Sequence, residues 1–157
     1  MEMDQDFREF GRLLLEHDVR FLIVGGYAVA VHGAPRFTGD LDTWIWIDRS
    51  NAERVLAVLE AFGFGSLPIS AADLMSPDLV IQLGYPPHRI DLLTGIDGVE
   101  FDEAWHRRVT ITVDGDELPF ISRDDLITNK KAAARPQDLA DVAALLKGND
   151  PGSIGES

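Results

Sequence analysis

FLIVGGYAVAVHGAPRFTGDLDTWIWI, residues 21–47, is the stretch that decides the fold. An apolar run at 21–24 passes into the pair Gly25-Gly26, and a second apolar run begins with an Asp-Leu-Asp triplet. Because side chains alternate between the two faces of a strand, Asp40 and Asp42 share one face. Two carboxylates held so close repel each other unless a cation lies between them. The stretch therefore predicts two strands joined by a short helix, with a carboxylate pair at the start of the second strand.

The composition predicts one globular domain over residues 1–147, followed by a flexible tail at 148–157. The chain has 157 residues, 45% of them hydrophobic and 26% charged, which suits one core rather than two. It contains no cysteine, so neither disulfides nor thiolate metal sites are expected. The first residues are acidic, unlike those of a signal peptide, and no apolar run approaches the ~20 residues of a membrane span. We expect a soluble cytoplasmic protein with no membrane partner.

The strongly acidic balance argues against broad nucleic-acid binding. The formal net charge is −13, from 14 basic and 27 acidic residues, and such a surface repels a phosphate backbone. Basic residues gather only at 106–108 and at 130–135. The first group is at least as well explained by solvated positions beside helices.

The hydrophobic periodicity predicts an α/β or α+β fold, with helices packed on a sheet and a helical C-terminal end. Expected helices are 4–17, 26–31, 52–62, 70–74, 101–106, 122–134 and 136–147. Expected strands are 21–24, 41–47, 79–83, 89–93, 109–113 and 118–121. The pairs 79–93 and 109–121 read as antiparallel hairpins, the second with a type I′ turn at Asp114-Gly115.

Asp91 supplies a third candidate carboxylate. It lies between Ile90 and Leu92 in a short apolar strand, so its side chain faces away from theirs. If that strand pairs beside 41–47, Asp91 joins Asp40 and Asp42, and three such carboxylates bind Mg²⁺, with substrate phosphates completing the shell. The alternative is that Asp91 only forms an ion pair with Arg89 or Lys130.

The glycine pair adds a candidate phosphate cradle. Gly25 and Gly26 open a helix, where free backbone N–H groups can face a triphosphate and a side chain would obstruct it. No Gly-Lys-Ser/Thr follows, so this is not a P-loop. Cradle and carboxylates together point to phosphoryl or nucleotidyl transfer, although a tight turn without a ligand would also use these glycines.

The pattern resembles the nucleotidyltransferase superfamily of DNA-polymerase-beta type. The shared features are an apolar strand, Gly25-Gly26, about a dozen residues, Asp40-Leu41-Asp42 and a later carboxylate, Asp91. The string 25–42 and the late segment 129–141 (NKKAAARPQDLAD) are similar to a small bacterial branch close to abortive-infection toxin nucleotidyltransferases.

That resemblance implies a mixed sheet with flanking helices and a Mg²⁺-dependent transfer of a nucleoside monophosphate from an NTP such as ATP. It implies two Mg²⁺ ions bound by Asp40 and Asp42, with Asp91 as base or bridging ligand for the acceptor hydroxyl. Lys130 would contact the triphosphate. The chain lacks the larger C-terminal part of the toxin members, which argues against tRNA as the acceptor.

Several residues keep two interpretations. Arg36 and Thr38 share the parity of the Asp pair if their segment is extended, so both are candidates for nucleotide binding. The alternative for Arg36 is that it anchors an aspartate. Lys130 either contacts phosphate or lies on a solvated helix face. Asp138 and Asp141 are three residues apart on one helix face, from which they can orient Lys130.

The expected function is nucleotidyl transfer to an unknown acceptor, whether a small molecule, a protein or a tRNA end, in a toxin–antitoxin or phage-defence setting. One alternative is a catalytically silent antitoxin or regulatory module that binds a partner protein. Another is a small-molecule adenylyltransferase of the antibiotic-modifying kind, since the acidic surface suits a cationic acceptor better than tRNA.

Overall fold

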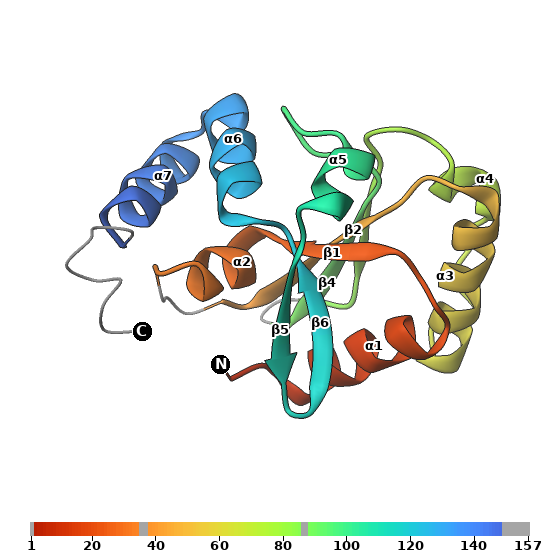
Figure 1. Cartoon of the computed structure of the whole chain (residues 1–157). Helices are drawn as coiled ribbons and strands as arrows, with labels where there is room; N and C mark the ends of the chain where they lie inside the picture. Colours follow the sequence, from red (N-terminus) through yellow and green to blue (C-terminus); the bar gives the residue numbers. More distant parts are fainter. Residues whose placement is uncertain (1, 35–37, 86–87, 149–157) are drawn as a thin grey trace.

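A computed structural model describes residues 2–34, 38–85 and 88–148 and shows a mixed sheet with helices on both faces (Figure 1). The strands are β1 (Phe21–Val24), β2 (Asp40–Ile45), β3 (Val80–Leu83), β4 (Arg89–Leu93), β5 (Val109–Val113) and β6 (Asp116–Phe120). The helices are α1 (Gln5–Glu16), α2 (Gly25–Val31), α3 (Arg49–Ala61), α4 (Ala71–Leu74), α5 (Phe101–His106), α6 (Arg123–Ala133) and α7 (Pro136–Gly148). The α/β fold class predicted from the sequence is confirmed.

The strand order β3-β4-β2-β1-β6-β5 places β2 near the centre of the sheet. β2 runs antiparallel to β1 and parallel to β4. The two hairpins predicted from the sequence are β3–β4 and β5–β6, which form the two edges. The second turns at Asp114 and Gly115, whose φ angles of 51° and 88° are those of a type I′ turn.

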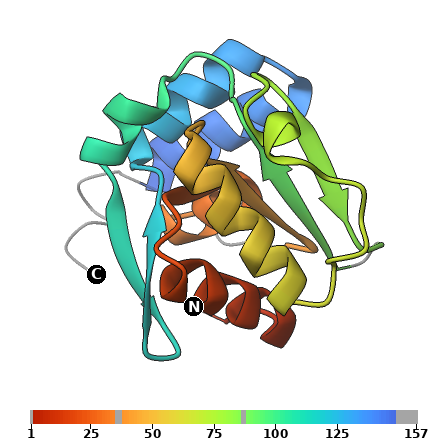
Figure 2. The ribbon, with the colours of Figure 1, turned by 90° about the vertical axis from the view of Figure 1, so that its right-hand side faces the viewer.

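The even-numbered residues of β2 define one face of the sheet, which we call the carboxylate face. Trp44 lies on this face, and its ring meets Phe101 of α5 at 5.0 Å between centroids. α1 packs on the opposite face, where Gly11 approaches the side chain of Leu118 in β6. α3 lies beside α1 (Figure 2), and the rings of Phe10 and Phe62 meet across that contact. The main core fills the space between the sheet and α1 and α3.

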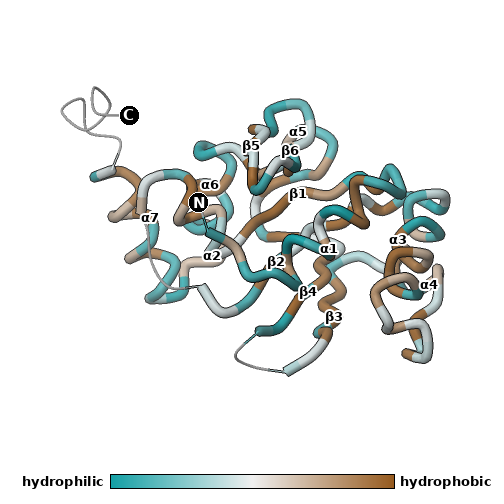
Figure 3. The backbone as a smooth tube through the Cα atoms, turned by 90° about the horizontal axis from the view of Figure 1, so that it is seen from below, coloured by the Kyte–Doolittle hydropathy of each residue, from teal (hydrophilic) through white to brown (hydrophobic). Residues whose placement is uncertain are grey.

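The colouring by hydropathy follows these layers (Figure 3). β1 is brown along its length, in agreement with its four buried residues, whereas α1 alternates between teal and brown. Within the described residues, none of the helices has the length and apolar character needed to cross a membrane.

Helix boundaries follow their capping residues. Asp48 accepts a hydrogen bond from the backbone of Asn51, so α3 begins at Arg49, three residues before the predicted start. Ser70 and Asp73 form a reciprocal capping box on α4, and Ser122 caps α6. The predicted flexible tail falls at 149–157, outside the described residues, apart from Gly148, which ends α7.

Strand β2 ends two residues earlier than predicted, because the chain leaves the sheet to reach α3. Asn51 organises this exit. Its side-chain amide donates to the carbonyls of Arg20 and Trp46 at 3.1 and 2.9 Å, and its oxygen accepts from the Arg20 N–H at 2.8 Å. One fully buried side chain thus ties together the start of β1, the end of β2 and the first turn of α3.

We predict that Asn51→Ala lowers the free energy of unfolding by about 3 kcal/mol, because it removes three hydrogen bonds and leaves the Arg20 N–H and the Trp46 carbonyl without the partner that Asn51 supplies. Urea denaturation followed by circular dichroism measures this. Asn129→Ala is the matched control, since Asn129 makes one exposed bond, to the Asp97 carbonyl, and should cost less than about 1 kcal/mol. Equal losses in the two variants would contradict the role assigned to Asn51.

Candidate functional site

The candidate site centres on two carboxylates in adjacent strands. In the parallel pairing of β2 with β4, Asp42 stands opposite Asp91, and Asp40 stands opposite Arg89. Residues directly opposite in paired strands point to the same face. The pairing therefore places Asp91 on the carboxylate face, beside Asp42 and not on the far side of the sheet.

Arg89 links the outer two carboxylates. Its Nε donates to Asp91 Oδ1 at 2.8 Å, and its Nη2 donates to Asp91 Oδ2 and to Asp40 Oδ2, both at 3.2 Å. The ion pair between Asp91 and Arg89 that the sequence left open is thus formed, and it coexists with the approach of Asp91 to Asp42. Arg89 was not among the predicted site residues. It could have been found from its position two residues before Asp91, because residues two apart in a strand point to the same face.

Asp42 is the carboxylate of the site whose pKa is shifted most strongly. Burial raises the pKa of Asp42 to about 7, assisted by the charge of Asp91, a hydrogen bond shared with Asp91 and the charge of Asp40. Lys130 acts in the opposite direction on the same carboxyl. Asp42 is therefore a carboxylate that lacks sufficient positive charge around it.

Gly25 lies against the Asp42 carboxylate, which occupies the space that a side chain at position 25 would need. Its φ is +69°, and a Cβ at this position would lie 2.0 Å from Asp42 Oδ2. The sequence interpretation assigned the glycine pair to phosphate; the geometry gives Gly25 a further reason, which is to admit the Asp42 carboxylate against the backbone. Gly26 follows it, buried in the first turn of α2.

Lys130 lies in a buried ion-pair cluster between α6 and α7. Its Nζ contacts Asp138 Oδ1 at 3.3 Å and Asp141 Oδ2 at 3.0 Å, and Arg135 Nε contacts Asp138 Oδ2 at 2.6 Å. Burial alone would raise the pKa of Asp138, but bonds from Arg135 and Lys130 hold that pKa below its usual value. The solvated-face interpretation of Lys130 is wrong, since only 7% of the residue is exposed. The two aspartates orient it, as the helix spacing indicated.

The two other predicted nucleotide-binding residues precede β2. Thr38 is half-buried and comes two residues before the strand. Arg36 lies outside the described residues.

The donor set suits a hard divalent cation. Asp42 and Asp91 offer adjacent carboxylate oxygens, and the raised pKa of Asp42 marks a place where positive charge is lacking. Within residues 2–34, 38–85 and 88–148, no three acidic or histidine side chains are gathered closely enough to enclose an ion. The fit is thus to an ion that two protein carboxylates hold and that phosphate oxygens complete.

Comparison with known proteins finds a family model that matches most of the chain. The sequence profile of a family described as "Nucleotidyltransferase of unknown function (DUF6036)" matches residues 1–147. No curated protein matches the chain significantly.

Two solved structures share the fold. The lincosamide antibiotic adenylyltransferase LnuA, in its lincomycin-bound form, superposes with a TM-score of 0.55 at 13% identity, covering 92% of this chain and 96% of LnuA. A putative nucleotidyltransferase from Thermotoga maritima gives a TM-score of 0.56 at 14% identity, covering 96% of this chain and 91% of its own. At these identities the likeness concerns the fold.

We predict that Gly25→Ala lowers the free energy of unfolding by about 3 kcal/mol, from a left-handed backbone and a displaced Asp42 carboxylate. Gly115→Ala is the matched control: its φ is +88° but no atom lies within 4 Å of the added Cβ, so it should cost about 1 kcal/mol. Urea denaturation of both variants measures the difference. Identical costs would show that Asp42 does not constrain position 25.

We also predict that Asp42→Asn stabilises the metal-free protein at alkaline pH. The folded-state pKa of about 7 exceeds the ordinary 3.8, so the wild type loses stability as pH rises between those values. In EDTA at pH 8 the variant should exceed the wild type by about 2 kcal/mol, since each pKa unit is worth ~1.4 kcal/mol and solvent screens part of the repulsion. At pH 4.5 the two should differ little.

The control for this prediction is Glu117→Gln, which changes an exposed carboxylate on β6 and should shift neither pH point. An Asp42→Asn protein less stable than the wild type at pH 8 would contradict the electrostatic assignment.

Proposed function

This chain belongs to the nucleotidyltransferase family whose profile spans residues 1–147, and we propose that it transfers a nucleoside monophosphate from an NTP to a hydroxyl group, with Mg²⁺ as cofactor. The observation that carries the proposal is the side-by-side placement of Asp42 and Asp91 on one sheet face. Two repelling carboxylates side by side do not stabilise the fold. Binding of a divalent cation between them would explain why both are present.

The carboxylates divide the work in this proposal. Asp42 and Asp91 hold the metal, and Asp40, which Arg89 now binds, joins them only when Arg89 releases it. Mg²⁺, as a pair of ions in the form we expect, neutralises phosphate charge and lowers the pKa of an acceptor hydroxyl when it is bound. We infer that Asp91, the more buried of the outer two, takes the hydroxyl proton.

The reaction forms a bond from the acceptor oxygen to the α-phosphorus and breaks the bond between that phosphorus and the β-phosphate oxygen. Pyrophosphate leaves, and the proton of the acceptor hydroxyl passes to Asp91. Lys130 supplies positive charge to the leaving phosphates. The pairing of Lys130 with two aspartates supports this role, because it fixes the ammonium group in a position from which it already acts on Asp42.

Arg89 has a separate task in this scheme. With three N–H groups directed to two carboxylates, it keeps Asp40 and Asp91 oriented while no cation is present. We infer that it yields some of these contacts when metal and nucleotide bind. A small acceptor fits better than tRNA, since the net charge of −13 repels the phosphodiester backbone of an RNA. The toxin–antitoxin or phage-defence setting stays a prediction.

The test is label transfer. Wild-type protein with Mg²⁺ and each of the four α-labelled NTPs, incubated with a cell extract, should label an extract component with at least one of the nucleotides. Asp42→Ala and Asp91→Ala should lower the rate by at least ~10³-fold, as expected for loss of metal-binding groups. Removal of Mg²⁺ by EDTA should have the same effect.

Two controls separate chemistry from folding. Glu117→Gln should transfer label at the wild-type rate. Mg²⁺ with the accepted NTP should raise the melting temperature of the wild type and not that of Asp42→Ala, because a ligand of the native state stabilises it. Transfer that persists in Asp42→Ala would refute the assignment of the site.

A further inference from the structure

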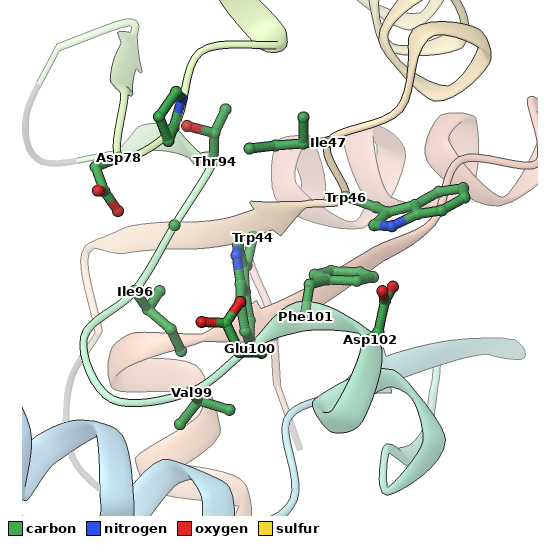
Figure 4. A pocket seen from close by; sticks show the side chains of 12 residues that line it. Trp44, Trp46, Ile47, Asp78, Thr94, Ile96, Val99, Glu100, Phe101 and Asp102 are labelled. Carbon is green, nitrogen blue, oxygen red and sulfur yellow. The ribbon is translucent and has the colours of Figure 1, made fainter.

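A cavity opens on the carboxylate face at the end of β2 (Figure 4). Its volume is about 370 Å³. The walls come from the end of β2, the turn before β3, the segment after β4 and the first turn of α5. None of the predicted site residues lines it.

The floor of this cavity is aromatic. Trp44 is only 2% exposed, and Phe101 packs against it edge to face. In Figure 4 the Trp44 indole nitrogen lies on the side of the ring away from Phe101. An indole N–H is a hydrogen-bond donor, so an oxygen atom of a ligand in the cavity can accept from it.

The rim of the cavity is acidic. Asp78, Glu100 and Asp102 line it, and all three are exposed. None of them forms an ion pair with any other described residue, and no Lys, Arg or His is among the lining residues. Carboxylates around an aromatic surface favour an organic cation and repel the phosphates of a nucleotide.

The cavity adjoins the candidate site. Trp44 lies two residues after Asp42 on the same face of β2, which is ~7 Å along a strand. Trp46, just beyond the end of β2, is half-buried and also lines the cavity, and the Arg20 guanidinium lies 4.8 Å from its ring centroid. A ligand resting on Trp44 and Phe101 can therefore present a group to the row formed by Asp42 and Asp91.

We propose that this cavity is the acceptor subsite and that it takes an organic cation bearing hydroxyl groups. The amine meets the acidic rim, the apolar body rests on the aromatic floor, and a hydroxyl oxygen accepts from the Trp44 N–H. A second hydroxyl attacks the α-phosphorus, pyrophosphate leaves, and the hydroxyl proton passes to Asp91. This inference rests on the proposed nucleotidyl transfer, whose acceptor class it defines.

The first test is binding of a charged probe and its neutral isostere. Choline and 3,3-dimethylbutan-1-ol have the same shape and the same hydroxyl and differ only in charge. Each is titrated into the full ¹⁵N-labelled chain at constant ionic strength while the indole N–H signals are followed by NMR, assigned with Trp44→Phe, Trp46→Phe and Trp105→Phe. Choline should shift the Trp44 and Trp46 signals to saturation, with a Kd at least ten-fold lower than that of the isostere.

Variants of the rim show whether the carboxylates cause the preference. The double variant Glu100→Gln/Asp102→Asn should weaken choline binding at least ten-fold and leave the isostere unchanged. Glu103→Gln, on the same helix but outside the cavity, should bind choline as the wild type does. Equal affinity for the two probes, or choline binding that survives the double variant, would overturn the proposal.

The second test joins the cavity to the reaction. The small molecules of the extract are passed over a sulfonate cation exchanger before label transfer, and acceptor activity should be retained and then eluted by salt. Activity found only in the unretained fraction would overturn the subsite while the transferase proposal stands. If no fraction is labelled, the transferase proposal fails and the acceptor assignment fails with it, whereas the NMR titration still decides whether the cavity binds cations.

Discussion

The structure depends on the parallel pairing of β2 with β4. This one register brings Asp42 beside Asp91 and Arg89 beside Asp40, although the two strands are almost fifty residues apart in sequence. A shift of a single residue would send Asp91 to the other face of the sheet, into the core, because strand side chains alternate. Burial of Ile90 and Leu92 prevents that shift, so the hydrophobic core holds the register on which the site relies.

Charge is distributed unevenly around the site. Asp40 and Asp91 share the single positive charge of Arg89, whereas Asp138 and Asp141 are neutralised by Lys130 and Arg135. Asp42 stands between these two groups with less compensation than either. A buried carboxylate in that state costs folding free energy, and functional sites are where such costs are usually found. The interactions that offset it lie elsewhere, in the core below the sheet and in the buried bonds of Asn51.

The order of the elements could be predicted from the sequence because each has a strong local signal. Apolar runs mark β1 and β4, the Asp-Gly pair marks the β5–β6 turn, and Ser122 marks the start of α6. The pairing of Asp42 with Asp91 could be predicted only on the assumption that their strands are neighbours. Alternation fixes the face of a side chain within its own strand but does not determine which strand lies beside it.

Two features could not be derived from local patterns. The contact of Gly25 with the Asp42 carboxylate depends on the angle between β1 and α2 and on the neighbouring strand. The hollow beside Trp44 depends on how α5 sits over β2. Trp44 is 2% exposed, so its place in an apolar strand predicts a packed ring and does not reveal the hollow that it lines.

The missing side chain of Gly25 has an evolutionary consequence. The room that a Cβ would need is taken by an oxygen of Asp42, so neither position can change freely while the other stays as it is. In a lineage that abandons the acid, only the left-handed backbone still favours glycine at position 25; where the acid persists, the glycine must persist with it. Positions 25 and 42 are thus inherited as a unit, and homologues in which one has changed without the other should be rare.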